Sequence, residues 1–249
     1  SASAGSAPPP AATLIESFQP DLFTGRTTTA IPIAVPPGRK GMQPSLALAY
    51  SSSARDGWLG VGWDLELGSI ERSTKRGVPA YDSSDTFLLA FQGVTFELVP
   101  TGANTYRAKD EGLFLRITFL GPSSWEVQDK AGTRYLFGGT PEAEQPGAGG
   151  IFRWHLTKVI DTNNNYLLIS YIQDQGQVYP YQIHYTGHEP SGLSPANTVE
   201  FTLEPRTNDI ETSSRSGARI TTAKRLKEIT VTAAGQLVRT YRLSYAQSP

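Results

Sequence analysis

Two histidines and a glutamate have the spacing of a metal site. His184 and His188 lie four positions apart and Glu189 follows, and on a helix this spacing would place the ligands on one face. Gly187 and Pro190 interrupt the segment, which predicts a strand that runs into a loop. Because side chains four apart do not converge in that geometry, we expect no metal site here.

A Ser/His/Asp hydrolase is a second chemistry that the residue types permit. His155 lies between Trp154 and Leu156 in an alternating segment, which predicts a packed or surface side chain. No Gly-x-Ser-x-Gly nucleophile elbow occurs. The run Gly60-Val-Gly62 has no phosphate-binding lysine and predicts a β-bulge. A dispersed hydrolase site stays open, and it requires Ser, His and Asp to converge in one cleft.

Clustered side-chain oxygens at 161–165 raise the question of calcium. Asp161 is followed by three asparagines, at 163, 164 and 165. Oxygen ligands suit Ca²⁺, but Asn also tolerates the left-handed backbone of a hairpin turn. We therefore expect a turn here, and for the whole chain we expect no catalytic residue, no metal and no cofactor.

The composition limits the class of protein. The chain has 249 residues, a formal net charge of −1 and no cysteine. It therefore has no disulfide framework or thiolate metal site, and nothing in its charge favours a nucleic-acid or anionic membrane partner. No apolar run reaches the ~18 residues of a transmembrane helix, so we expect no direct membrane insertion. With 24 glycines and 18 prolines, the profile is that of many short strands joined by turns.

Apolar residues alternate with polar ones along many short segments, which is typical of half-buried strands. The clearest are 31–35, 46–50, 94–98, 167–171, 181–185 and 199–203. The segment 218–231 is the best helical candidate, but its β-branched residues favour strands. The fold class we expect is all-β, a curved antiparallel sheet or sandwich built from successive hairpins.

Three hairpins share one design, in which an apolar strand, a turn with Gly or Asn and an aromatic return strand follow each other. They span 125–137, 154–171 and 226–241. The Gly- and Pro-rich segment 138–150 shows no strand pattern. We therefore predict a flexible linker at 1–25, a first β sub-sheet at 26–137, a loop at 138–150 and a second sub-sheet at 151–249.

Several ordered motifs resemble one known family. They are Pro37-Gly-Arg-Lys-Gly41 with Pro44-Ser-Leu-Ala-Leu-Ala-Tyr-Ser-Ser52, then Gly57-Trp-Leu-Gly-Val-Gly-Trp-Asp-Leu65, then Tyr81-Asp-Ser-Ser-Asp-Thr-Phe-Leu-Leu89. Segments 204–210 and 216–229 are compatible with the same pattern. Together they resemble the N-terminal domain of the SpvB family, which includes the B component of insecticidal Tc toxins. The residue types of these motifs, taken by themselves, predict turns and bends.

The resemblance implies a non-catalytic segment of a hollow, RHS-like β shell that encapsulates a toxic polypeptide and helps deliver it. It implies as partners the rest of an RHS-type chain, a Tc C-like component, the enclosed toxin and a pore-forming A-like component. The implied location is a secreted toxin complex made first in the bacterial cytoplasm. The chain would then be a fragment of a longer protein.

The family's namesake also carries a separate ADP-ribosyltransferase domain, which needs a Glu-x-Glu pair and a Ser-Thr-Ser strand. Glu142-Ala-Glu144 matches the first pattern, but it lies in the Gly/Pro-rich segment and no Ser-Thr-Ser occurs. We expect a solvated acidic loop. The alternative function is a secreted carbohydrate- or receptor-binding sandwich, in which Trp58, Trp63, Trp125 and Trp154 form a stacking platform; we expect them to be core aromatics instead.

Overall fold

The computed structural model describes residues 17–20, 27–51, 57–110 and 113–246, and their regular structure is almost all β. The first strands are β1 (Ser17–Pro20), β2 (Thr27–Ile33), β3 (Leu46–Ser51), β4 (Trp63–Asp64), β5 (Ser69–Arg72), β6 (Phe87–Phe91), β7 (Val94–Pro100), β8 (Thr105–Ala108), β9 (Arg116–Gly121), β10 (Ser124–Gln128) and β11 (Arg134–Gly138). After the 3-10 turn η1 (Pro141–Ala143) come β12 (Glu144–Pro146), β13 (Ile151–Ile160), β14 (Asn165–Asp174), β15 (Gln177–His188), β16 (Asn197–Pro205), β17 (Glu211–Ser213), β18 (Ile220–Thr222), β19 (Lys224–Ala233) and β20 (Gln236–Arg242).

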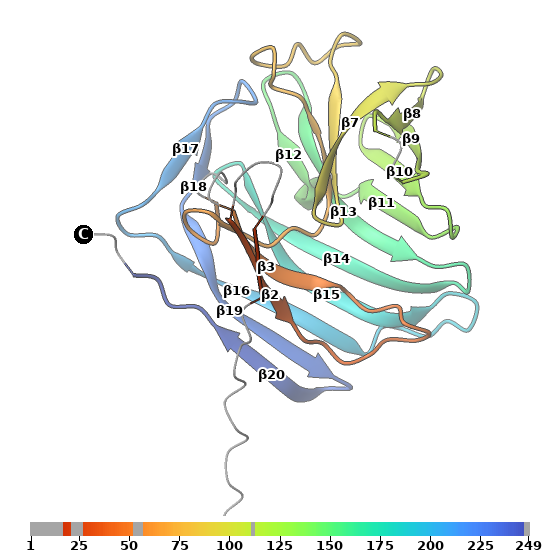
Figure 1. Cartoon of the computed structure of the whole chain (residues 1–249), viewed down its shortest axis with the longest axis vertical. Coiled ribbons are helices and arrows are strands. Elements are labelled where there is room, and N and C mark those ends of the chain that lie inside the picture. The colour runs from red at the N-terminus through yellow and green to blue at the C-terminus, as the bar shows by residue number, and fades with distance from the viewer. Residues whose placement is uncertain (1–16, 21–26, 52–56, 111–112, 247–249) are drawn as a thin grey trace, which may run out of the picture.

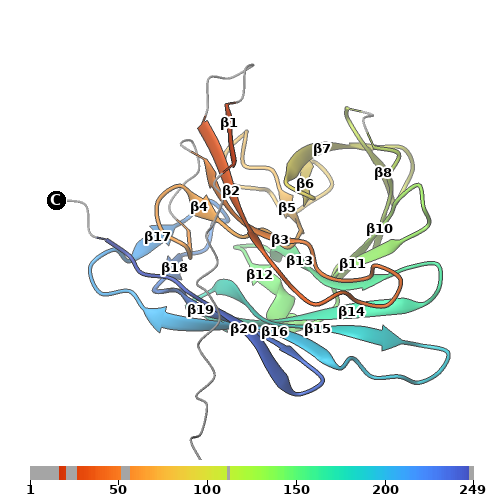
Figure 2. The ribbon, with the colours of Figure 1, turned by 60° about the horizontal axis from the view of Figure 1, so that its bottom comes forward.

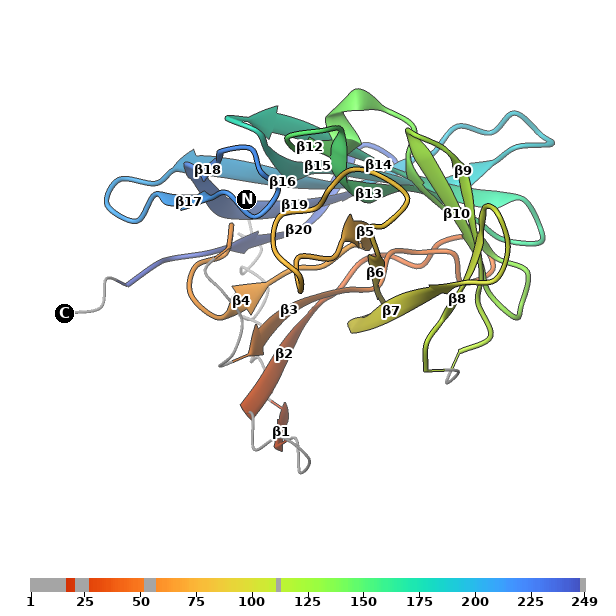
Figure 3. The same ribbon diagram turned by 90° about the horizontal axis from the view of Figure 1, so that it is seen from above.

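Part of the large sheet closes into a small barrel. Neighbouring strands from β5 to β11 pair antiparallel in sequence order. β13 then pairs with β11 on one side and with β5 on the other, which completes the ring. The closed part stands beside β14 in Figure 1 and is seen from above in Figure 3. Closure removes the two free edges that an open sheet would leave.

The rest of the large sheet is an open wing of long strands, β14-β15-β16-β19-β20. The β2–β3 hairpin lies across one face of the wing, as Figures 1 and 2 show. The Tyr185 hydroxyl donates to the Pro36 carbonyl at 2.7 Å, and the Tyr241 hydroxyl accepts from the Ala34 N–H at 2.8 Å. Ile33 and Leu46 of the hairpin belong to the common core. The hairpin is therefore a second layer, and the wing is buried on that face.

The core of the barrel is aromatic. Trp125 is fully buried, and its ring centroid lies 4.9 Å from those of Phe87 and Phe119 and 5.7 Å from that of Trp154. Most of these rings meet edge-on or tilted, which is the arrangement that aromatic quadrupoles favour. Alternating strands deliver them, because every second residue of β10 and β13 faces inward.

The all-β fold class is confirmed, and so are the three hairpins, which are formed by β10–β11, β13–β14 and β19–β20. Their turns place Gly132, Asn164 and Gly235 at positive φ, as the turn chemistry predicted. The segment 218–231 contributes to β18 and β19, so the preference for strands over a helix was right.

Two segments differ from the expectation. The range 138–150 contains β12, which pairs with β13, so the absence of a strand pattern was misleading there. Ser17–Pro20 forms β1 against β2 inside the predicted linker 1–25, while residues 1–16 and 21–25 lie outside the described residues. Strands β11 and β13 pair across the predicted boundary; whether 26–137 and 151–249 are separate folding units stays a prediction.

The described residues contain no helix with the length and apolar character that a membrane crossing needs.

We predict that Trp125→Ala lowers the free energy of unfolding by about 3–5 kcal/mol, because it opens a cavity among the rings of the barrel. Urea unfolding followed by circular dichroism measures this change. Val61→Ala is the control, because Val61 is 73% exposed and the substitution should change stability by at most about 0.5 kcal/mol. Equal effects of the two substitutions would show that Trp125 does not hold the barrel together.

Candidate functional site

The two histidines with the spacing of metal ligands form hydrogen bonds to other side chains. Both belong to β15, as the interrupted pattern predicted. His184 contacts Gln182 (Nε2 to Oε1, 3.0 Å), and His188 contacts Ser191 (Nδ1 to Oγ, 2.7 Å). Glu189 forms an ion pair with Lys158. Within the described part of the chain, no three His, Asp or Glu side chains gather as a metal site requires.

The two acidic motifs take different local structures. The Asp161 carboxylate accepts hydrogen bonds from the N–H groups of Asn163 (2.8 Å) and Asn165 (2.9 Å). This is an Asx-supported hairpin turn, so that interpretation is confirmed. Glu142 lies in η1 and is exposed, whereas Glu144 lies in β12 rather than in a loop.

Three of the four tryptophans are core residues, as expected. Trp58, Trp125 and Trp154 are at most 9% exposed, so they do not form an external stacking platform. Trp63 in β4 is half-buried, and its ring centroid lies 5.3 Å from that of Tyr50. It is therefore the tryptophan whose ring is most open to a ligand.

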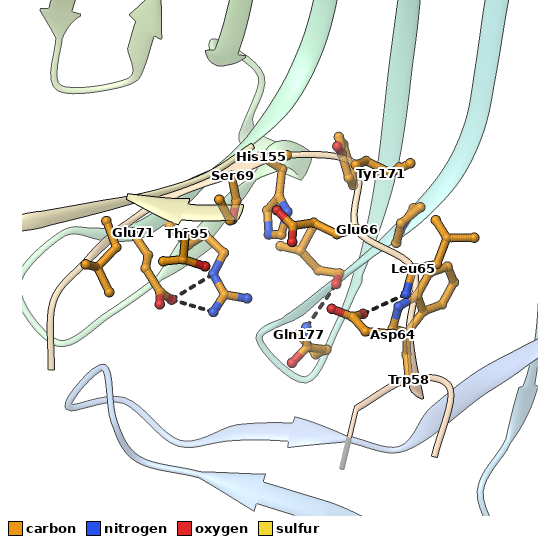
Figure 4. A pocket seen from close by; sticks show the side chains of 17 residues that line it. Trp58, Asp64, Leu65, Glu66, Ser69, Glu71, Thr95, His155, Tyr171 and Gln177 are labelled. Carbon is orange, nitrogen blue, oxygen red and sulfur yellow. Dashed lines mark hydrogen bonds and ion pairs between the residues drawn. The ribbon is translucent and has the colours of Figure 1, made fainter. Parts of the chain in front are cut away.

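A pocket of about 220 Å³ opens where the barrel meets the wing, and we call it the acid pocket. Three carboxylates line it: Asp64 from β4, Glu66 from the following loop and Glu71 from β5. Figure 4 shows them together with His155 and Tyr171, which also line the pocket. The sequence alone does not reveal this site. It shows acidic residues at 64, 66 and 71, but no local pattern indicates that their segment lies next to β13.

Glu71 is the one carboxylate of the pocket with ionic partners among the described residues. Arg153, its cross-strand neighbour, binds it through Nε at 3.1 Å and through Nη2, and Arg215 Nη2 lies at 3.4 Å. Burial opposes ionisation of Glu71, but the two guanidinium groups outweigh burial and lower its pKa. These three charged side chains join β5 and β13 to the loop after β17.

Glu66 has the opposite environment. The surrounding protein removes much of its hydration, and the charges of Asp64 and Glu71 add repulsion that Arg153 only partly offsets. Its pKa is raised to about 7, although Glu66 is an exposed residue. Asp64 is exposed as well. Partial loss of hydration raises its pKa, against the hydrogen bonds from the Leu65 N–H and the Trp58 side chain and the charge of Arg153. The pocket is therefore short of positive charge.

The pocket does bring a serine, a histidine and acids together, which was the condition set for a hydrolase. Ser69 is the cross-strand neighbour of His155. Among the described residues, however, His155 Nε2 is buried and has no hydrogen-bond partner, so no Ser-to-His bond is formed. Burial, with some help from Arg153, holds the pKa of His155 well below its usual range. The relay that a triad needs is not assembled in this geometry.

We predict that Glu66 makes the fold less stable as pH rises. Its pKa is about 7 in the fold against a model value of 4.5, so its penalty is absent below the lower value and complete above the higher one. Glu66→Gln removes the penalty. Because the pocket is open to solvent, we expect the variant to gain only about 1 kcal/mol over wild type between pH 4.5 and pH 8.5.

Urea unfolding of both proteins across this pH range gives the difference directly. Glu142→Gln serves as the control, because Glu142 is an exposed carboxylate away from the pocket. A Glu66→Gln difference that stays flat with pH would contradict the raised pKa.

Residues 22–113 match the family model described as Salmonella virulence plasmid 65kDa B protein, SpvB. The chain is also 26% identical over 203 residues to "Mono(ADP-ribosyl)transferase SpvB" of Salmonella choleraesuis (strain SC-B67), and 25% identical to the protein of that name from Salmonella typhimurium. The first match covers 70% of this chain and 34% of the relative. The chain thus spans about a third of the length of these curated relatives.

Solved structures extend the likeness to the fold of almost the whole chain. The crystal structure of TcdB2-TccC3-TEV superposes with a TM-score of 0.77 at 20% identity, over 97% of this chain and 15% of the other. A chain of the Photorhabdus luminescens Tc holotoxin pore gives 0.77 at 20% identity, over 94% and 15%.

A third structure is a separate domain of similar extent. The N-terminal domain of effector protein SpvB from Salmonella typhimurium strain LT2 superposes with a TM-score of 0.70 at 19% identity, over 87% of this chain and 99% of that domain. The chain is therefore related to the SpvB family in sequence, over residues 22–113 most directly, and it has the fold of the SpvB N-terminal domain.

Proposed function

We propose that this chain is a non-catalytic structural module of a Tc/RHS-type toxin complex, where it forms part of the β shell around a toxic polypeptide and helps its delivery. The observation that carries the proposal is how much of each chain the superposition covers. Almost all of this chain superposes on about 15% of a TcdB2-TccC3 chain. A fold that forms one part of a larger β-rich chain in such complexes is suited to the same place here.

The open edge of the wing supports the proposal. β20 is the last strand of the large sheet and pairs only with β19 among the described residues. Its residues Leu237 and Val238 are 66% and 48% exposed. An unprotected strand edge with apolar side chains favours addition of a further strand. In a shell, a neighbouring segment of the same RHS-type chain would cover this edge.

The module is proposed to have no enzymatic activity of its own. Its relatives are named as transferases, but the chain spans about a third of their length. The acid pocket offers Ser69 and His155 without the hydrogen bond that would activate a nucleophile. Under this proposal the partners are a C-like component, the enclosed polypeptide and an A-like pore component, in an exported complex.

A domain exchange tests the shell role. In TcdB2-TccC3, the segment that superposes on this chain is replaced by this chain, and proteinase K digestion of the TccC3 C-terminal region is followed with time. The parent complex is digested alongside. We expect that region to be digested no faster in the chimaera than in the parent complex, because the substituted module continues the wall. Digestion at the rate of the free polypeptide, in a chimaera that folds and assembles, would contradict the proposal.

Leu237→Lys with Val238→Lys probes the edge in the same chimaera. Both side chains are exposed, so circular dichroism of the isolated chain should be unchanged, whereas charges on the edge should weaken addition of the next strand and speed digestion. Val61→Lys is the matched control, because Val61 is 73% exposed and belongs to the turn before β4 rather than to the β20 edge. An edge variant that protects as well as this control would remove β20 from the wall.

Catalysis is tested separately with labelled NAD. We expect the isolated chain to transfer no ADP-ribose to lysate proteins above the background of a heat-denatured sample. Transfer that disappears in Glu144→Gln would show that the acidic pair at 142–144 is catalytic after all.

A further inference from the structure

A second, larger cavity lies next to the acid pocket. Its volume is about 640 Å³. One wall is formed by β17 and β18, a separate two-stranded sheet that we call the arm. We therefore call this cavity the arm cleft. β12, β13 and Trp63 of β4 form the other walls. Trp58, Asp64, Arg153 and Gln177 line both cavities. A cavity of this size suits a small ligand or a few side chains of a polypeptide.

The base of the arm cleft carries an unused hydrogen-bond acceptor. Gln145 of β12 lines the cleft and is only 5% exposed, and its Oε1 has no hydrogen-bond partner. Buried amide oxygens are nearly always bonded, because an unpaired one has lost its water without replacement. The group that would satisfy it must be a donor. Gln145 lines the cleft, and because its Oε1 has almost no accessible surface, the amide must turn toward the cleft to meet a ligand there.

The two arginines and the Gln177 amide that line the cleft already use donors within the protein. Arg153 and Arg215 are bonded to Glu71. Gln177 Nε2 donates to the Val178 carbonyl at 2.9 Å. Three acceptors of the cleft can take a donor from a ligand: Gln145 Oε1, the Asp64 carboxylate and the carboxylate of Glu211, which is exposed on β17.

The distribution of charge around the cleft also favours a positively charged ligand. Asp64 accepts a hydrogen bond from the Leu65 N–H at 2.9 Å but forms no ion pair within the described ranges. Glu66, the neighbouring carboxylate, is equally without one. Arg153 and Arg215 both pair with Glu71. A positive group placed between Gln145 and Asp64 would meet the acceptors that lack a cation.

An aromatic face completes the site. Trp63 is half-buried and lines the cleft. Cations are attracted to the face of an indole ring, and the protein already uses this contact in the same cleft. Arg153 and Arg215 lie over the ring of Phe152, with their guanidinium carbons 5.9 and 5.4 Å from its centroid.

We propose that the arm cleft binds an organic cation through a primary ammonium group, which donates to Gln145 Oε1 and the Asp64 carboxylate beside the face of Trp63. An ammonium has three donors and no acceptor, which matches an unpaired amide oxygen and a carboxylate without an ion pair. The ammonium comes either from a small diamine or from a lysine side chain of a polypeptide, and the proposal does not depend on the shell function.

Titration calorimetry of the whole chain tests the site with two probes, 1,5-diaminopentane and acetyl-Gly-Lys-Gly-amide. The neutral counterparts are 1,5-pentanediol and acetyl-Gly-norleucine-Gly-amide. We expect saturable binding of at least one amine, accompanied by a change in tryptophan fluorescence that is absent in Trp63→Leu, and no binding of the neutral compounds. Binding of the diamine alone identifies a small amine as the source, and binding of the peptide alone identifies a lysine side chain.

Gln145→Leu separates binding from folding. It removes the unpaired acceptor, so the fold should be as stable as wild type or more so, whereas affinity for the amine should fall about tenfold. Asp64→Asn should weaken binding by about as much. Glu142→Gln removes an exposed carboxylate outside the cleft and should leave affinity unchanged.

Three results would overturn the proposal. The first is that neither amine binds saturably. The second is that the diol or the norleucine peptide binds as well as its amine counterpart. The third is that Glu142→Gln weakens binding as much as Asp64→Asn, which would show a general attraction of cations to an acidic surface.

Discussion

The architecture depends on one strand having four partners. β13 lies between β12 and β5 along its first half and between β11 and β14 along its second half. Its pairing with β5 and β11 closes the barrel, and its pairing with β14 begins the wing, so both parts depend on the backbone hydrogen bonds of one strand. Its side chains serve both parts as well, since Trp154 packs in the barrel core while Arg153 and His155 reach the acid pocket. Displacing β13 would therefore open the barrel, release the wing and dismantle the pocket together.

Local patterns made most of the fold predictable. Leu167, Ile169 and Tyr171 alternate because each faces the core from β14, and Asn164 sits where its turn needs a positive φ. Such patterns involve residues that are close in the sequence, so they do not depend on how the strands are arranged in the fold. The strand β12 was missed because it has only three residues and ends in proline. It exists through its partner β13 rather than through a pattern of its own.

The acid pocket was not predictable for a related reason. Glu71 and Arg153 are 82 positions apart, and nothing in either segment indicates the register that makes them neighbours. The raised pKa of Glu66 depends on which charges surround it, and these come from β4, β5 and β13. Gln145 reads as an ordinary polar residue in a Gly/Pro-rich segment, yet it is buried with an unpaired oxygen. Tertiary contacts decide all three, whereas composition and spacing decide the turns.

The position of β13 in the chain also has a consequence for how the protein is made. Strands β5 to β11 precede it, and until residue 160 has left the ribosome the sheet they form has no strand to join its two ends. Synthesis proceeds at about 5–20 residues per second, so the half-built sheet exposes its edges and its aromatic side chains for seconds. Long-range pairings of this kind fold slowly. The nascent chain is thus most prone to aggregation, and most in need of chaperones, just before β13 has been synthesised.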